Sequence, residues 1–291
     1  MKDRRVIVNA DDLGFSPAVN EGIVRAHLEG IVTSATISPN MPAAAAAVGL
    51  LSGLDRLGVG VHLNASQGPP LSAQGRELAG SDGQMDYTAT GIVLACCLRP
   101  RLLDVVAAEF DAQIRWVLDH RIKPTHLDTH RHTHAFGPVF ARVAALARRY
   151  NIRFVRRHRE PLDALPASAW PGRRGPQAAM HRGLDPRRCV SRILTVLGAA
   201  NAAAAPQLHG TSWTLGVAHT GMIDSAWLIR AARTLRPGVT EIMTHPGLAE
   251  AERPAGTRLA SRQAELAALC DPQVKEAFRR RKVTLVHYGQ L

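Results

Sequence analysis

Short apolar runs alternate with longer amphipathic patterns along this 291-residue chain, and the alternation restricts the folds open to it. Strands that alternate with helices of ten or more residues form βα units and a parallel sheet. With about seven or eight such units, we predict an α/β protein with a (β/α) barrel that is TIM-like, with irregular and seven-stranded versions left open. This number of units favours a barrel over an open doubly wound sheet, and the absence of a glycine-rich fingerprint after any predicted strand argues against nucleotide binding. The predicted strands are 5–10, 31–37, 58–63, 125–130, 152–156, 211–217, 240–245 and 283–288.

The whole chain, residues 1–291, is expected to form a single barrel domain. The pattern shows no internal repeat and no linker, and a chain of this length buries a large core without disulfides or metals to hold it. Two segments, at about 64–100 and 157–210, are longer than a minimal barrel needs and are interpreted as loop insertions. The predicted helices are 17–29, 42–53, 101–121, 136–150, 186–199, 224–235 and most of 257–281.

Polar residues gather where the predicted strands end. Asp11 and Asp12 follow the first strand, His62 lies at the end of the third, and His245 ends the seventh. In a parallel barrel these strand ends converge on one face, where active sites are built. We therefore expect residues that are far apart in the sequence to share one site.

The stretch THLDTHRHTH, at 125–134, adds a dense group of polar side chains to that face. Residues of one parity on a strand point the same way, but this set cannot consist entirely of strand residues that face one core. The strand is therefore expected to end near residue 130, and 131–135 to turn into the loop. Imidazole and carboxylate together are typical ligands of a metal ion. The polar residues of one parity here are His126, Asp128, His130, His132 and His134.

A site of one carboxylate and two histidines leaves an ion open positions for water and substrate. The ion lowers the pKa of the water and polarises a carbonyl, and a second carboxylate can take the proton. One of the two adjacent aspartates would then be a ligand and the other the base, and the cation would remove the repulsion between them. This predicts hydrolysis of an amide or ester, while a non-heme Fe(II) oxygenase with the same donors stays open.

The net charge of +12 leaves another class open, a basic protein that binds a membrane or nucleic-acid surface. Only four of the 36 basic residues are lysines, and arginine pairs well with phosphates and carboxylates. Aromatic residues are only 4% of the chain and form no motif with basic ones, so no nucleic-acid partner is expected. Four cysteines without a CxxC pair, and no apolar leader, predict a cytoplasmic protein.

Four motifs together resemble the YdjC-like family, which includes chitooligosaccharide deacetylase. They are VNADDLGFSPAVNEGI, GVHLN, KPTHLDTHRHTH and EIMTHPG, in the family's order from residue 6 to about 247. The resemblance implies a (β/α) barrel and a divalent-metal carbohydrate deacetylase that acts on an N-acetylated amino sugar. It further implies Asp12, His62 and His130 as metal ligands, Asp11 as the base and His245 as the general acid.

The same resemblance implies that His126, Asp128, His132 and His134 support the ligands or contact the substrate. The implied ion is magnesium, whereas imidazole ligation favours zinc or another transition metal, so the identity of the ion stays open. The segment TSWTLGVAHTGMIDSAWLI is similar to the hopanoid-biosynthesis-associated branch, which implies an N-acetylglucosaminyl headgroup on a membrane lipid. Ten arginines within 153–192 would suit a peripheral contact at the inner face of the membrane. A homodimer is left open.

Overall fold

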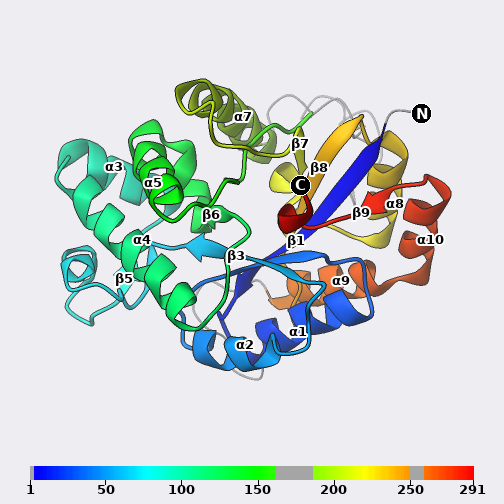
Figure 1. Cartoon of the computed structure of the whole chain (residues 1–291), viewed down its shortest axis with the longest axis horizontal. Helices are drawn as coiled ribbons and strands as arrows, with labels where there is room; N and C mark the ends of the chain where they lie inside the picture. The colour runs from blue at the N-terminus through cyan, green and yellow to red at the C-terminus, as the bar shows by residue number, and fades with distance from the viewer. Residues whose placement is uncertain (1–2, 162–185, 250–258) are drawn as a thin grey trace.

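The computed structural model describes residues 3–161, 186–249 and 259–291, and its centre is a curled parallel sheet (Figure 1). The strand order is β6-β3-β2-β1-β8-β7, with β9 beside the start of β1. All of these strands pair in parallel, which confirms the predicted irregular (β/α) barrel. The strands are β1 (Arg4–Leu13), β2 (Ser34–Ile37), β3 (Gly58–Leu63), β6 (Leu127–Thr129), β7 (Trp213–Leu215), β8 (Gly238–Thr244) and β9 (Thr284–Leu285).

The predicted strand at 152–156 is not a strand in the structure. Its backbone pairs on one side with Leu127 and on the other with His209, so only isolated bridges form and no ladder develops. Further along, the Thr214 N–H donates to the Arg159 carbonyl oxygen at 3.1 Å. The segment therefore spans the gap between β6 and β7 and completes the curled sheet as an irregular chain.

Helices follow most of the strands, and their starts agree with the sequence signals. Ser16 caps α1 by accepting from the Val19 N–H, and Pro17 occupies the first helical position. The amphipathic pattern predicted for 101–121 is α4, whose apolar face is buried. The helices are α1 (Pro17–Leu28), α2 (Ala44–Leu50), α3 (Ala89–Leu98), α4 (Leu102–Asp119), α5 (Gly137–Arg149), α7 (Pro186–Ala204), α8 (Ser225–Thr234), α9 (Leu259–Cys270) and α10 (Pro272–Arg280).

Both predicted insertions contain regular structure where they are described. The first holds a short antiparallel pair, β4 (Gln67–Gly68) with β5 (Met85–Asp86), the 3-10 helix η1 (Gln74–Leu78) and α3. Its Gly, Pro and Ser content predicted a loop, and the helix α3 was missed. The second contains α7, which begins at the predicted residue 186, while 162–185 lie outside the described residues.

A close contact between two glycines fixes the segment that follows β8. A β-carbon added to Gly22 of α1 would lie 2.5 Å from the Cα of Gly247. Beside it, the Leu248 N–H donates to the Ala18 carbonyl oxygen at 3.0 Å. Because His245 lies two residues before Gly247, α1 helps to place a candidate site residue.

We expect Gly22→Ala to lower the free energy of unfolding by about 1–3 kcal/mol, because the added methyl group has no room. Chemical denaturation measures this. The matched control is Gly49→Ala in α2, where an added β-carbon meets nothing within 4 Å. Alanine is favoured in helices, so the control should be neutral or stabilising by up to about 1 kcal/mol. Equal stability of the two variants would contradict the close contact.

Candidate metal and active site

The two adjacent aspartates at the end of β1 both face the interior of the barrel. Neighbouring residues on a regular strand point to opposite faces. Here the register of β1 against β2 shifts between Ala10 and Leu13, and Asp12 has a left-handed backbone with φ of 72°. This bulge turns the second side chain back towards the first, so that both carboxylates lie close to His62.

Three side chains from three strand ends form a compact triangle of donor atoms. His62 Nε2 lies 3.4 Å from Asp12 Oδ1, and His130 Nδ1 lies 3.3 Å from the same oxygen. The two histidine nitrogens are 3.4 Å apart. His62 belongs to β3, and His130 begins the 3-10 helix η2 (His130–Ala135) directly after β6. The structure thus brings together the three residues implied as metal ligands.

The triangle fits a divalent ion. An ion bound about 2.1 Å from each donor separates adjacent donors by about 3.0 Å in octahedral or 3.4 Å in tetrahedral geometry. Asp12 Oδ1 is buried and has no hydrogen-bond partner among the described residues, as expected for an atom that would bind an ion. Burial alone would raise the pKa of Asp12, but Arg262 and the two histidines hold it well below its usual range.

Each histidine of the triangle is oriented through its other nitrogen. His62 Nδ1 lies 2.7 Å from Asp128 Oδ1, and His130 Nε2 lies 3.2 Å from Gln67 Oε1. Acceptors of this kind fix the tautomer and the ring orientation of a metal-binding histidine. Although burial opposes it, the neighbouring Asp128 and Asp12 raise the pKa of His62 to about 10. The family resemblance implied a supporting role of this kind for Asp128, whereas Gln67, which lies in the first insertion, was not predicted.

We expect Gln67→Ala to weaken the affinity for a divalent ion by about 10- to 100-fold, because His130 loses the acceptor that orients it. Calorimetric titration of the ion into the metal-free protein measures the change. Gln74→Ala, at an exposed position in η1, is the matched control and should bind the ion as the original protein does. An unchanged affinity of the Gln67 variant would show that this contact does not hold His130.

Arg156 is a fully buried cation that connects the carboxylates of the site. Its guanidinium nitrogens lie 2.6 Å from Asp11 Oδ1, 2.8 Å from Asp128 Oδ2 and 2.8 Å from Glu241 Oε1. The Tyr288 hydroxyl donates to the other oxygen of Glu241 at 2.7 Å. Sequence analysis missed both Arg156 and Glu241. The available signals were an arginine that ends the run IRFVR, at 152–156, and a glutamate within the predicted strand TEIMTH, at 240–245.

Asp11 lies just outside the triangle and is held as a carboxylate. Burial would raise its pKa, but the Arg156 charge and its two hydrogen bonds bring the pKa below the ordinary value. The Asn9 amide also donates to Asp11 Oδ1 at 2.8 Å. Asp11, His62 and Asp128 each place a side-chain atom within 4.8 Å of the others.

His245 follows β8 and lies beside the two aspartates. Its backbone N–H donates to Glu265 Oε2 at 2.6 Å, which fixes the main chain at this point. Burial lowers the pKa of the imidazole to about 4, even though Asp11 and Asp12 oppose the shift. His245 is therefore neutral at neutral pH.

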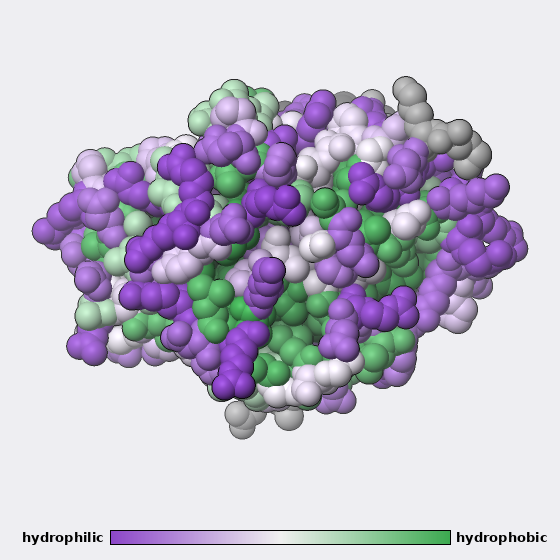
Figure 2. Space-filling model, viewed as in Figure 1, coloured by the Kyte–Doolittle hydropathy of each residue, from purple (hydrophilic) through white to green (hydrophobic). Residues whose placement is uncertain are grey.

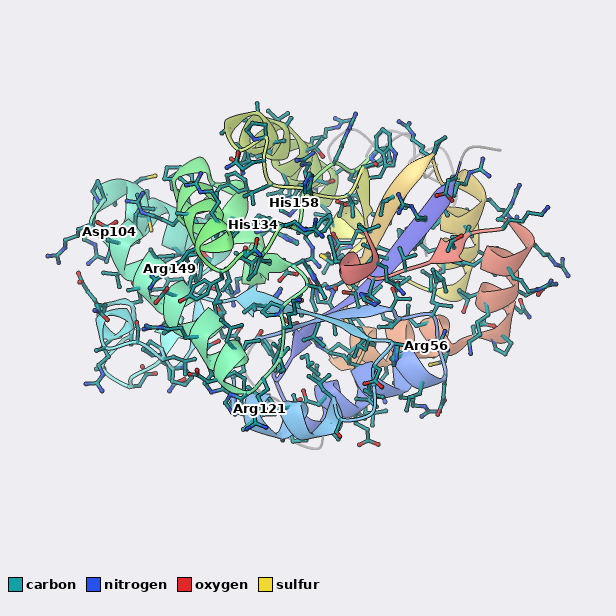
Figure 3. All side chains as sticks on the ribbon, viewed as in Figure 1. Arg56, Asp104, Arg121, His134, Arg149 and His158 are labelled. Atoms are coloured by element: carbon teal, nitrogen blue, oxygen red, sulfur yellow. The ribbon has the colours of Figure 1, made fainter. Side chains whose placement is uncertain are left out.

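The other histidines of the cluster lie outside the triangle. His126 points away from it and stacks on the Tyr288 ring at 3.9 Å, and burial lowers its pKa to about 3. His134 binds the Thr129 hydroxyl at 2.6 Å and stacks on His158 (Figure 3). His132 meets the same His158 ring edge-on at 4.8 Å. These side chains pack around the site and do not complete the donor set.

Arg262 of α9 is a second cation that sequence analysis missed. It is buried, and its Nη2 lies 2.5 Å from Asp12 Oδ2, the carboxylate oxygen that faces away from the triangle. Each of the two aspartates thus has its own arginine. This arrangement allows two adjacent buried carboxylates to remain ionised together.

Comparison with known proteins gives consistent results. The model of a family described as YdjC-like protein matches residues 5–280. A carbohydrate deacetylase of Clostridium beijerinckii is 39% identical over 148 residues, which cover 51% of this chain and 58% of that protein. One of Halalkalibacterium halodurans is 38% identical over 148 residues, 51% of this chain and 62% of that protein. The chain thus spans less than two thirds of the length of these curated relatives.

A solved structure shares the fold over the full length. It is that of a protein from Enterococcus faecalis provisionally described as a cellobiose-phosphate cleavage protein. The two structures superpose with a TM-score of 0.76 over 99% of this chain and 98% of the other. At 22% sequence identity, this similarity concerns the fold alone.

Proposed function

Because this chain belongs to the YdjC-like protein family, we propose that it is a metal-dependent hydrolase that removes the acetyl group from an N-acetylated amino sugar. The observation that carries the proposal is the Asp12–His62–His130 triangle, with the ionised Asp11 directly beside it. The relatives named carbohydrate deacetylases support the class of substrate. In this proposal amide hydrolysis yields acetate and a free amino sugar.

The residues around the triangle supply the groups that this chemistry needs. A divalent ion held by Asp12, His62 and His130 would lower the pKa of a water molecule and polarise the acyl carbonyl. Asp11 then accepts the proton of the attacking water, because Arg156 keeps it ionised and ready to act as a base. His245, which is neutral beforehand, relays this proton to the departing amine nitrogen.

The second carboxylate favours hydrolysis over the oxygenase alternative. A non-heme Fe(II) oxygenase uses the same two histidines and one carboxylate. Asp11 would have no evident role in that reaction, whereas hydrolysis requires a base at this place. Oxygen consumption in the presence of a 2-oxo acid is expected to be absent.

We further propose that the working ion is a transition metal such as zinc or cobalt. Two of the three donors are imidazole nitrogens, which favour these ions over magnesium. The spacing of the donors is compatible with either coordination geometry, so it does not distinguish the ions. Reconstitution with single metals distinguishes them.

A lipid-linked amino sugar is the finer form of the substrate proposal. The helices α3 and α7 both contact η2 and expose apolar side chains, and in Figure 2 part of the surface over α7 is pale green. Leu98 of α3 is 73% exposed and Val196 of α7 is 70% exposed. Both helices lie beside η2, the helix that carries His130, and in this proposal an apolar aglycone rests on them. Among the described residues, no helix is long and apolar enough to cross a bilayer.

The decisive experiment measures acetate release by metal-free protein reloaded with magnesium, zinc, manganese or cobalt. N-Acetylglucosamine oligomers and an N-acetylglucosaminyl lipid in detergent micelles serve as substrates. Metal-dependent acetate release from either supports the hydrolase, and release from the lipid alone supports the finer proposal. If neither substrate releases acetate with any of the four ions, the proposed function is overturned.

A further inference from the structure

Several polar atoms around the two aspartates are buried without a partner. Among the described residues, they include Asp12 Oδ1, His132 Nδ1, His245 Nδ1 and Arg262 Nη1, as well as Asn9 Oδ1. Their charges act on one another, since Arg262 contributes to the low pKa of His245, and His245 to that of His132. A bound ion accounts for the first atom only. The other atoms are left without a hydrogen-bond partner, although buried polar groups are rarely unpaired.

Arg262 is held rigidly beside Asp12. The side chain is 7% exposed, and Nη2 is already engaged by Asp12 Oδ2. Its carbonyl oxygen accepts from the Gly247 N–H at 3.3 Å, and its aliphatic stem packs against the same glycine. One turn further along α9, Glu265 accepts from the His245 N–H. The helix thus fixes Arg262 and His245 with respect to each other.

The free edge of the guanidinium restricts what can bind there. Arginine donates hydrogen bonds and accepts none, and it remains charged, so a buried N–H of this group requires an acceptor. The amine that leaves in a deacetylation is itself a donor. The acyl side instead offers a carbonyl oxygen in the substrate and a carboxylate in the product, which a planar guanidinium binds well.

We propose that Arg262 contacts the acyl group, with its Nη1–H donating first to the acyl oxygen and then to the carboxylate of the released acetate. This inference rests on the proposed function. In the reaction the C–N bond breaks, the water oxygen joins the acyl carbon, and the amine nitrogen takes the proton. Negative charge therefore grows on the acyl side, next to a cation already positioned to receive it.

The test measures acetate binding to the metal-loaded protein by calorimetry, with the metal content of each sample determined separately. Arg262→Met should weaken acetate binding by about 10- to 100-fold, since a charge-assisted hydrogen bond is lost. Arg262→Lys keeps a cation beside Asp12 but loses the second donor of the fork, so it should bind metal normally and acetate at least about 10-fold more weakly. Arg25→Met, at an exposed arginine of α1, is the control and should change neither.

Kinetics give an independent measure of the same contact. Arg262→Lys should lower kcat for acetate release by about 100-fold and leave KM within a few-fold, since the contact strengthens as charge develops. Wild-type acetate affinity in Arg262→Lys, or no acetate binding by the original protein, would overturn the inference. If acetate binding depends on Arg262 while no amino sugar is deacetylated, the acyl contact stands and the proposed substrate class fails.

Discussion

Replacing Asp11 by asparagine is expected to lower the turnover number for acetate release by about 10²- to 10⁴-fold without removing the metal. The amide has nearly the same shape as the carboxylate but cannot accept a proton from water. A loss of this size is usual when a general base is removed. Asp11 is not one of the three donors of the triangle. Arg156 keeps Asp128 and Glu241 as partners in the variant, so the buried cation stays compensated.

The measurement pairs kcat with the metal content of the same preparation. Asp111→Asn is the matched control, because this aspartate of α4 pairs with Arg149 and Tyr150 away from the site and should leave turnover unchanged. His62→Ala is the opposite control and should lose both metal and turnover. If the Asp11 variant keeps its metal and its full activity, Asp11 is not the base.

The barrel could be predicted from the sequence because its signals are local. The Ser16 cap and Pro17 mark the start of α1, and the run at 58–63 is β3 to the residue. The error at 152–156 has a non-local cause. That run has the composition of a strand, but it pairs only through single bridges, with Leu127 at the start of the three-residue β6 and with His209, which lies outside the described strands. Composition shows the preference of a segment and not the regularity of its partners.

The gathering of polar residues at one face was also predictable, because parallel strands deliver their ends there. The choice of Asp12, His62 and His130 as donors came from the resemblance to the YdjC-like family. The supporting residues were not predictable. In the sequence, Arg262 resembles any other basic residue of an amphipathic helix. It contacts Asp12 only because the fold brings together two residues that are 250 positions apart in the sequence. Gln67 lies in an insertion that was interpreted only as a loop, because no helix or strand pattern in the sequence predicts its backbone conformation. The left-handed backbone of Asp12 equally follows from the bulge and not from its residue type.

The arginines show how two adjacent acids can end one buried strand. Asp11 is compensated by Arg156, and Asp12 by Arg262 on one oxygen and by the candidate ion position on the other. The carboxylates are thereby given different surroundings before any substrate arrives. A base and a ligand of the same residue type can then have different roles, since their neighbours and not their identity set their chemistry.

Arg156→Met is expected to be the most destabilising single substitution at the site, lowering the free energy of unfolding by about 3–5 kcal/mol. Methionine fills much of the same volume but leaves Asp11, Asp128 and Glu241 buried together without their shared cation. The penalty comes from these uncompensated charges and not from a lost surface contact. Urea denaturation of the metal-free protein measures it without interference from metal binding.

Two further variants separate the charge effect from general damage. Arg149→Met removes an exposed arginine of α5 (Figure 3) that pairs with Asp111 at 3.0 Å, and it should cost less than about 1 kcal/mol. Adding Glu241→Gln to Arg156→Met removes one of the unpaired charges, and the amide can still accept from the Tyr288 hydroxyl. The double variant should therefore be more stable than Arg156→Met alone. If it is less stable, packing and not charge is the reason that this arginine is buried.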